Sequence, residues 1–241
     1  MTNIIDIHSH ILPGLDDGAA DMEESMKMLR LARRQGITQI AATPHYSAGF
    51  PNICPEKIRE LCRKVQESAR QKLQTEFYIW PGQEIMFGND VVHLLDNKDI
   101  LTIADSRYVL VEFLPGVPYS GLLRAVRELV LEGYVPILAH SERYICLREQ
   151  GRIDDLKAQG AYIQLNFRRI GGKWYENTTR WCRRMLQAGK VDFLGTDMHN
   201  SRERRPETAP GIEWMQKHLS RDYIDRILSR NQKKVLADEK I

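Results

Sequence analysis

The sequence predicts an α/β protein built from parallel strand–helix units. Seven short apolar runs recur along its 241 residues, separated by amphipathic helical patterns or long loops. Such alternation is typical of a parallel sheet whose connections are helices. Histidines and carboxylates follow many of these runs, at the strand ends where functional groups gather in both doubly wound sheets and closed barrels. Both architectures remain open at this point.

The predicted strands are rich in β-branched and other apolar residues. They cover Ile4–His8, Gln39–Thr43, Phe77–Gly82, Tyr108–Glu112, Val135–Ala139, Ala161–Asn166 and Val191–Thr196. The first helix is predicted from Met22 onward, because apolar side chains recur on one face, and Gly36 is placed to end it. Further helices are predicted over Pro55–Leu73, Tyr119–Glu132, Glu176–Ala188 and the segment after Pro206. Without a linker or an internal repeat, residues 1–241 are expected to form a single domain.

Composition excludes several classes of protein. A formal charge of +3 is too small to indicate nucleic-acid binding without a concentrated basic patch. The chain has no run of 18 apolar residues, so we expect no membrane span, and its N-terminus leaves no room for a signal peptide. Four cysteines without a close-spaced pair favour a reduced, cytoplasmic protein.

The stretch DIHSHILPGLDDG directs attention to metal binding. Residues i and i+2 of an extended chain point to the same side, so His8 and His10 can aim their rings at one point. Other predicted strands also end in histidine or carboxylate, although burying an unpaired charge is costly. The set at strand ends comprises His8, His10, His45, Glu84, Glu112, His140, Asp197 and His199.

These residue types indicate the chemistry. Imidazole suits zinc, iron, copper and nickel, and carboxylate favours harder ions such as manganese. The set contains no cysteine and exceeds what one ion needs, so we expect two or three ions that share a bridging carboxylate. Clustered divalent ions activate water and stabilise the oxygens of phosphoryl displacement, which makes hydrolysis the expected reaction class.

The motifs DIHSHILPGLDDG, ATPHY, GQE, VEF, AHSERY and GTDMHN occur in the order and spacing of the polymerase and histidinol phosphatase (PHP) superfamily. Within it, residues 4–205 resemble the bacterial manganese-dependent protein-tyrosine phosphatases of the CpsB/YwqE-like group. The resemblance implies a single PHP-type metallophosphatase domain folded as a seven-stranded (β/α)7 barrel, a distorted TIM-like fold. It also implies a trinuclear metal centre.

The resemblance also implies a role for each ligand. The first ion would be held by His8, His10, Glu84 and Asp197, the second by Glu84, Glu112 and His140, and the third by His45 and His199, with Asp17 beside it as a ligand or supporting acid. Glu84 would bridge two ions, and a hydroxide between two ions would be the nucleophile. Mn²⁺ is the expected metal, with Fe, Zn, Co or Mg as alternatives. Asp16 is interpreted as a turn residue of the PGLDDG loop.

Two arginines match the family's phosphate clamp. Arg143 and Arg204 follow His140 and His199, and guanidinium binds phosphate oxygens bidentately. After TDMHN the chain reads SRERRPE, which departs from the family pattern, so Arg202 or Arg205 could replace Arg204.

One motif is interpreted as a chance match. Cys146 and Arg152 have the C-x5-R spacing of cysteine-dependent tyrosine phosphatases. That loop needs small residues whose amides surround phosphate, and a thiolate in a positive environment. The bulky interior LREQG does not provide them.

The resemblance implies a protein-tyrosine phosphatase that acts on the phosphotyrosine tail of a bacterial tyrosine kinase regulating capsule or exopolysaccharide synthesis. The alternatives are a phosphoesterase for a small metabolite such as histidinol phosphate, a silent interaction protein and an exonuclease-like module. Rim residues expected to contact substrate are the aromatics Tyr46, Phe50, Tyr119 and Phe167 and the arginines Arg168, Arg169, Arg202 and Arg205.

Overall fold

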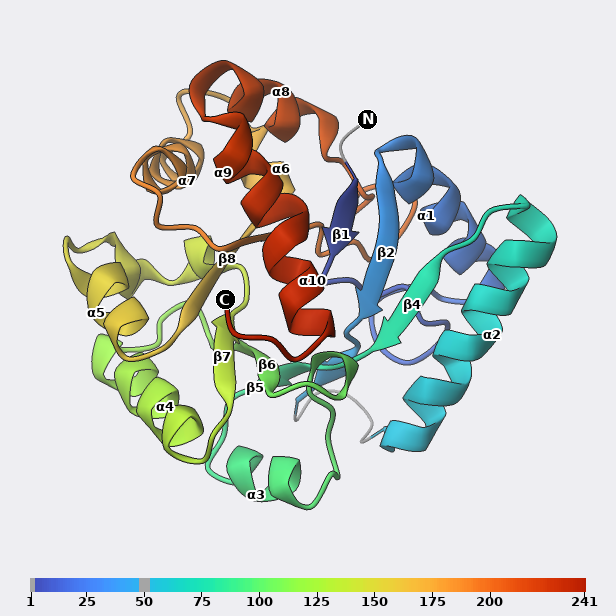
Figure 1. Ribbon diagram of the computed structural model, residues 1–241, viewed down its shortest axis with the longest axis horizontal. Helices are drawn as coiled ribbons and strands as arrows, with labels where there is room; N and C mark the ends of the chain where they lie inside the picture. Colours follow the sequence, from blue (N-terminus) through green and yellow to red (C-terminus); the bar gives the residue numbers. More distant parts are fainter. Residues whose placement is uncertain (1–2, 48–52) are drawn as a thin grey trace.

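Parallel strands form a curled sheet with helices along its outer side (Figure 1). The computed structural model describes residues 3–47 and 53–241. Within them the strands are β1 (Ile4–Asp6), β2 (Ile37–Ala42), β3 (His45–Tyr46), β4 (Tyr78–Pro81), β5 (Glu84–Met86), β6 (Tyr108–Glu112), β7 (Val135–Leu138), β8 (Tyr162–Asn166) and β9 (Phe193–Gly195). They pair in the orders β1-β2-β4 and β3-β5-β6-β7-β8-β9, and every pair is parallel. The predicted parallel α/β class is confirmed.

All seven predicted strands are present, and two short strands occur in addition. Two residues separate β2 from β3, and two separate β4 from β5; β3 and β5 pair through His45 and Glu84. The breaks fall at Thr43–Pro44 and Gly82–Gln83. Proline cannot donate a ladder hydrogen bond, and glycine weakens a strand interior, so the chain bends at both points and each following strand joins the second ladder.

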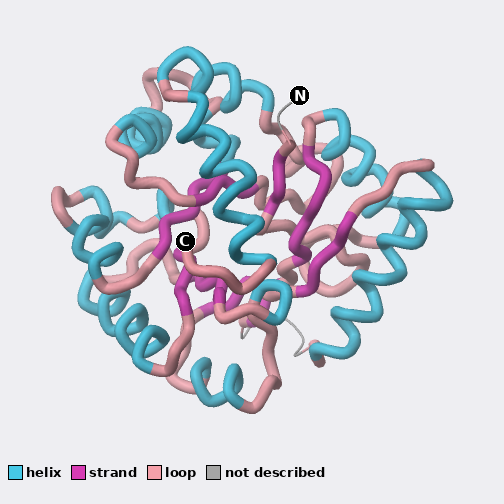
Figure 2. The backbone as a smooth tube through the Cα atoms, viewed as in Figure 1, coloured by secondary structure: helices cyan, strands magenta, loops and turns pink. Residues whose placement is uncertain are grey.

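Helices connect the strands and close the outer surface (Figure 2). They are α1 (Met22–Arg34), α2 (Pro55–Leu73), α3 (Val91–Asp96), α4 (Tyr119–Leu131), α5 (Arg152–Ala158), α6 (Phe167–Ile170), α7 (Asn177–Gln187), α8 (Ala209–His218), α9 (Arg221–Asp225) and α10 (Asn231–Leu236). Single turns η1 (Ile103–Asp105), η2 (Ser141–Arg143) and η3 (Ile145–Arg148), and the π-helical η4 (Arg226–Arg230), complete the set. No helix in the described ranges is long and apolar enough to cross a membrane.

Local signals in the sequence account for the first helix. The Asp21 side chain accepts a hydrogen bond from the Glu24 N–H at 2.9 Å, which satisfies one of the free donors at the start of α1. At its end, Gly36 has φ +85°, a left-handed conformation that glycine adopts without steric cost. The predicted termination at Gly36 is confirmed.

Two hydrophobic clusters support the sheet. The larger lies between the strands and the outer helices, and the smaller fills the interior of the curl with Ile7, Leu110, Ile137 and Phe193. Val235 of α10 belongs to the interior cluster, and α10 crosses the centre of the molecule in Figure 1. The C-terminal segment therefore covers the amino ends of the strands and leaves the carboxyl ends for the site.

A stability test follows from this interior cluster. Phe193→Ala should lower the free energy of unfolding by about 3–5 kcal/mol, because it removes a fully buried ring and leaves a cavity. Leu131→Ala is the matched control, since Leu131 is 83% exposed and should change stability by less than about 0.5 kcal/mol. Urea unfolding measures both variants, and equal costs would contradict the assignment of Phe193 to the core.

Candidate metal centre

The carboxyl ends of the parallel strands meet at one edge of the curled sheet, and the proposed metal ligands lie there. His8 and His10 follow β1, His45 and Glu84 open β3 and β5, Glu112 ends β6, His140 follows β7, Asp197 and His199 follow β9, and Asp17 lies in the loop before α1. The nine side chains occupy four overlapping groups, so the fold brings them into one cluster.

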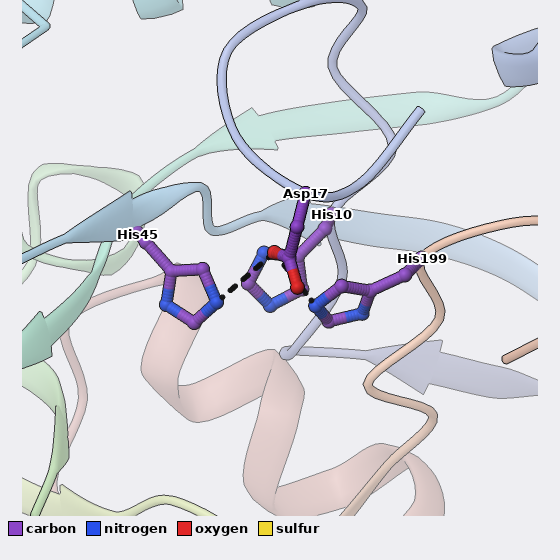
Figure 3. Close-up of side chains that lie close together, drawn as sticks. All are labelled: His10, Asp17, His45 and His199. Carbon is purple, nitrogen blue, oxygen red and sulfur yellow. Dashed lines mark ion pairs between the residues drawn. The ribbon is translucent and has the colours of Figure 1, made fainter. Parts of the chain in front are cut away.

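Each group could hold an ion, because its ligand atoms lie within 4.8 Å of one another. The groups are His8, His10 and Asp197; His8, Glu84 and His140; His45, Glu84 and Glu112; and His10, Asp17, His45 and His199. In the last group, Asp17 Oδ1 lies 3.4 Å from His45 Nε2 and 3.3 Å from His199 Nε2 (Figure 3). Glu84 is shared between two groups, the arrangement that a bridging carboxylate requires.

Glu84 is the fully buried centre of the cluster. Its Oε2 lies 3.2 Å from one ring nitrogen of each of His8, His10 and His45. Its Oε1 lies 2.7 Å from His140 Nε2. Among the described residues, Oε2 makes no hydrogen bond of acceptable geometry. A buried oxygen that faces three imidazoles without such a bond fits a divalent ion bound by mixed nitrogen and oxygen ligands.

The electrostatics of the cluster favour positive charge at its centre. Burial alone would lower the pKa of the His10 imidazole, but Asp16 and Glu84 outweigh burial and raise that pKa to about 9. Burial likewise opposes protonation of His140, whose pKa Glu84 and other carboxylates raise to about 9. The pKa of Glu84 itself is held well below its usual range, although burial acts in the opposite direction. Divalent cations would satisfy the same carboxylates.

Asp16 is more than a turn residue. It caps the turn by accepting the Gly18 N–H at 2.9 Å, as expected, but its Oδ2 also lies 2.7 Å from His10 Nδ1 and accepts the His45 N–H at 3.0 Å. A carboxylate on the outer nitrogen of a ligating histidine orients the ring and increases its basicity. A Cβ on Gly18 would lie 2.2 Å from the His10 carbonyl oxygen, so only glycine fits this approach. The first acid of the DDG sequence, next to the candidate ligand Asp17, was the signal for this role.

Both proposed clamp arginines reach the cluster. Arg143 Nη2 donates to Asp197 Oδ2 at 2.6 Å, and Arg204 Nη2 donates to Asp197 Oδ1 at 2.8 Å. Arg205 pairs instead with Glu207 at 2.6 Å. Of the three arginines left open by the sequence after TDMHN, Arg204 is the one whose described side-chain contacts reach the cluster.

The Cys146 motif does not form a phosphate-binding loop. Cys146 lies in η3, where its carbonyl oxygen accepts a hydrogen bond from Arg152 at 2.9 Å. Burial raises the pKa of its thiol, which disfavours the thiolate that nucleophilic catalysis needs. The interpretation as a chance match agrees with this geometry.

The aromatic rim expected from the sequence is partly wrong. Phe167 is 1% exposed and packs in the outer core, so it cannot contact substrate, because β8 continues directly into α6 and turns this ring inward. Tyr119 lies under the Arg152 guanidinium, 4.8 Å from its ring centroid. Tyr46 is half-buried in β3, and Phe50 lies outside the described residues.

Comparison with known proteins shows the family. A family model described as "Capsular polysaccharide synthesis, CpsB/CapC" matches residues 4–237. Tyrosine-protein phosphatase YwqE of Bacillus subtilis is 30% identical, over 99% of this chain and 93% of that protein. Tyrosine-protein phosphatase CpsB of Streptococcus pneumoniae is 31% identical, over 99% of this chain and all of that protein.

Solved structures agree. One described as crystal structures of YwqE and CpsB, "unique metal-dependent tyrosine phosphatases", matches with a TM-score of 0.90 and 31% identity, over 99% of this chain and 96% of that chain. A phosphotriesterase homology protein from Escherichia coli matches with a TM-score of 0.58 and 13% identity, over 98% and 99% of the chains, which shows a likeness of fold alone. The likeness to the CpsB/YwqE-like group is confirmed, and the chain belongs to the CpsB/CapC family of capsular polysaccharide synthesis proteins.

Proposed function

We propose that this chain is a metal-dependent protein-tyrosine phosphatase. The observation that carries the proposal is the cluster of nine histidine and carboxylate side chains around buried Glu84, with two arginines on its Asp197. The names of its relatives, tyrosine-protein phosphatases YwqE and CpsB, support the same activity. The substrate would be phosphotyrosine on a bacterial tyrosine kinase that regulates capsule or exopolysaccharide synthesis.

The proposed metal centre would hold two or three ions. His8, His10 and Asp197 would hold the first with Glu84, which would also be a ligand of the second. Glu112 and His140 would complete the second site, and His45, His199 and Asp17 would hold the third. We propose Mn²⁺, with Fe, Zn, Co or Mg as alternatives, because the donors mix imidazole with carboxylate. Bound divalent ions would supply water activation and neutralise charge on the phosphoryl oxygens.

Side chains other than the metal ligands would bind the phosphate group of the substrate. Arg143 and Arg204 lie on the two oxygens of Asp197, so each guanidinium is within reach of a phosphate group held against the cluster. They would bind its non-bridging oxygens and favour the charge that develops there. The nearby His199 and His45 rings lower the pKa of Asp17, which would therefore stand as an anion at the rim.

The surface beside Arg204 supports an acidic protein substrate. Arg168 and Arg169 line a cavity of about 330 Å³ together with Lys173. Arg168 Nη2 donates to the backbone carbonyl of Glu203, the residue that precedes Arg204. Burial lowers the pKa of Arg168, and the charge of Arg204 lowers it further. Phosphotyrosine suits a recessed centre, because its phosphate stands farther from the peptide backbone than that of phosphoserine.

We also propose that residues 1–241 form one cytoplasmic domain with no nucleic-acid partner. Its sheet would be the seven-stranded (β/α)7 barrel of a distorted TIM-like PHP fold. In that description β2 with β3, and β4 with β5, each count as one interrupted strand, which agrees with the short gaps between them.

Metal removal tests the mechanism. Exhaustive chelation should abolish activity on a phosphotyrosine peptide, and Mn²⁺ should restore it best among divalent ions. Glu84→Gln should lower activity by more than the roughly 10- to 100-fold typical of residues behind the ligands, because it removes the central anion. Glu142→Gln is the control, since Glu142 is equally buried but belongs to none of the four ligand groups. Turnover by a verified metal-free sample would contradict the proposal.

The arginines separate phosphate binding from metal binding. Arg143→Ala and Arg204→Ala should each lower kcat/KM by roughly 10- to 150-fold at unchanged metal content, equivalent to a charge-assisted hydrogen bond of about 1.5–3 kcal/mol. Arg205→Ala should have little effect, because Arg205 pairs with Glu207. If Arg202→Ala or Arg205→Ala is severe while Arg204→Ala is silent, the assignment of the clamp is wrong.

The substrate is tested by competition among phosphate esters. A phosphotyrosine peptide with acidic flanks should exceed a phosphoserine analogue and histidinol phosphate by at least about tenfold in kcat/KM, or roughly 1.4 kcal/mol. High salt should reduce this advantage, since exposed charges are screened. Arg168→Gln should reduce it too, whereas Arg34→Gln, on exposed α1, should not. Preference for histidinol phosphate would reject a protein substrate and leave the metal centre intact.

A further inference from the structure

Strand β8 holds none of the nine candidate ligands, yet it places two buried amide side chains against the cluster. Gln164 and Asn166 are 0% and 7% exposed. They are two positions apart in β8, so their side chains point to the same face of the strand. We propose that they are positioning residues, which fix the His8 ring and the Asp197 carboxylate in the orientation that metal binding requires. This inference rests on the metal centre of the proposed function.

The orientation of the Gln164 amide is set by the backbone. Its Oε1 lies 2.6 Å from the backbone nitrogen of His140, which can only donate. The oxygen and not the nitrogen of Gln164 must therefore occupy this position. His140 has φ +31°, an unusual conformation for a residue with a Cβ, and this hydrogen bond helps to hold it.

The same oxygen determines the tautomer of His8. His8 Nδ1 lies 3.1 Å from Gln164 Oε1, so Nδ1 must carry the hydrogen and donate it. A neutral imidazole then presents an unprotonated Nε2. That nitrogen faces Glu84 Oε2 at 3.2 Å and Asp197 Oδ1 at 3.6 Å, in the interior of the cluster. Gln164 therefore directs a free lone pair toward the proposed ion.

The other end of the amide orients Asp197 through Asn166. Gln164 Nε2 donates to Asn166 Oδ1 at 2.9 Å, so Asn166 must present its Nδ2 to Asp197 Oδ2, at 2.8 Å. This bond occupies the oxygen of Asp197 that lies away from the histidines. The opposite oxygen, Oδ1, lies 3.6 Å from the Nε2 atoms of both His8 and His10. The backbone N–H of His140 thus sets the orientation of both side-chain amides, Gln164 and Asn166, which together form an amide relay.

Gly195 in β9 preserves the space that the relay needs. A Cβ at this position would lie 2.9 Å from His8 Cβ and 3.0 Å from Gln164 Nε2. At such distances a side chain would have to displace the ring or the amide. The relay therefore lies on β8, the His8 ring that it orients follows β1, and the glycine that leaves room for both lies on β9.

Metal affinity tests the proposal without any substrate. Gln164→Leu should weaken Mn²⁺ binding by roughly 10- to 100-fold in a calorimetric titration of the metal-free chain, as for other residues that orient metal ligands. Gln232→Leu is the matched control, because Gln232 is equally buried and its side chain donates to the Ile227 carbonyl in the C-terminal helices, away from the metal ligands. Both variants should lose stability, but only Gln164→Leu should lose metal affinity.

A second variant keeps the test valid if Gln164→Leu does not fold. Asn166→Ala removes the bond to Asp197 and the bond from Gln164 Nε2, but it leaves the bonds of Gln164 Oε1 to His8 and His140 in place. It should weaken Mn²⁺ binding by about tenfold. In the Gln164→Leu/Asn166→Ala double variant the losses should be less than additive, since Gln164 acts on Asp197 through Asn166. Wild-type affinity in the folded single variants would overturn the relay. Absence of Mn²⁺ binding by the unsubstituted chain would instead reject the proposed metal centre.

Discussion

The buried charge of Glu84 is the constraint on which the site depends. A carboxylate removed from water is costly unless positive or hydrogen-bonding groups surround it, and Glu84 is fully buried. Four histidines from three separate segments supply those groups, at 2.7–3.2 Å from its two oxygens. They can do so because a curled parallel sheet directs the carboxyl ends of its strands to one place. Burial of the Glu84 carboxylate therefore depends on the curvature of the sheet, since a flatter sheet would separate the histidines and leave the carboxylate unpaired.

The backbone departs from regular geometry where ligands must turn inward. His45 and Glu84 open the short strands β3 and β5, after breaks at Pro44 and Gly82, and do not end longer strands. His140 and Asp197 have φ values of +31° and +52°, which a residue with a Cβ adopts at a cost of about 1–3 kcal/mol each. The Asp197 N–H donates to the His8 carbonyl at 2.9 Å, and the His140 N–H donates to Gln164. Neighbouring strands thus hold the strained residues in place.

The sequence was sufficient for the strands, most helices and the set of candidate ligands, because these follow from local patterns. A histidine or acid after an apolar run needs no knowledge of tertiary structure to be noticed. Gln164 and Asn166 were missed, since a polar residue inside a strand gains its role only when the neighbouring strands and their register are known. Phe167 was misplaced for a related reason: its position after a strand suggested the rim, but the immediate start of α6 turns its ring into the core. The short strands β3 and β5 were missed too, because they are recognised only by their pairing with each other and by the pairing of β5 with β6.

Asp197 contacts candidate ligands, both arginines and the amide relay, so the choice of residue to substitute decides which role an experiment can test. One of its oxygens faces His8 and His10 and accepts from Arg204, and the other accepts from Arg143 and Asn166. Loss of this carboxylate would remove a candidate ligand, the partner of both arginines and the end of the amide relay together. Effects within one network are not additive, so its substitution cannot assign a role to any of them. The arginines and amides each touch Asp197 from one side only, and substituting them distinguishes phosphate binding from ligand orientation.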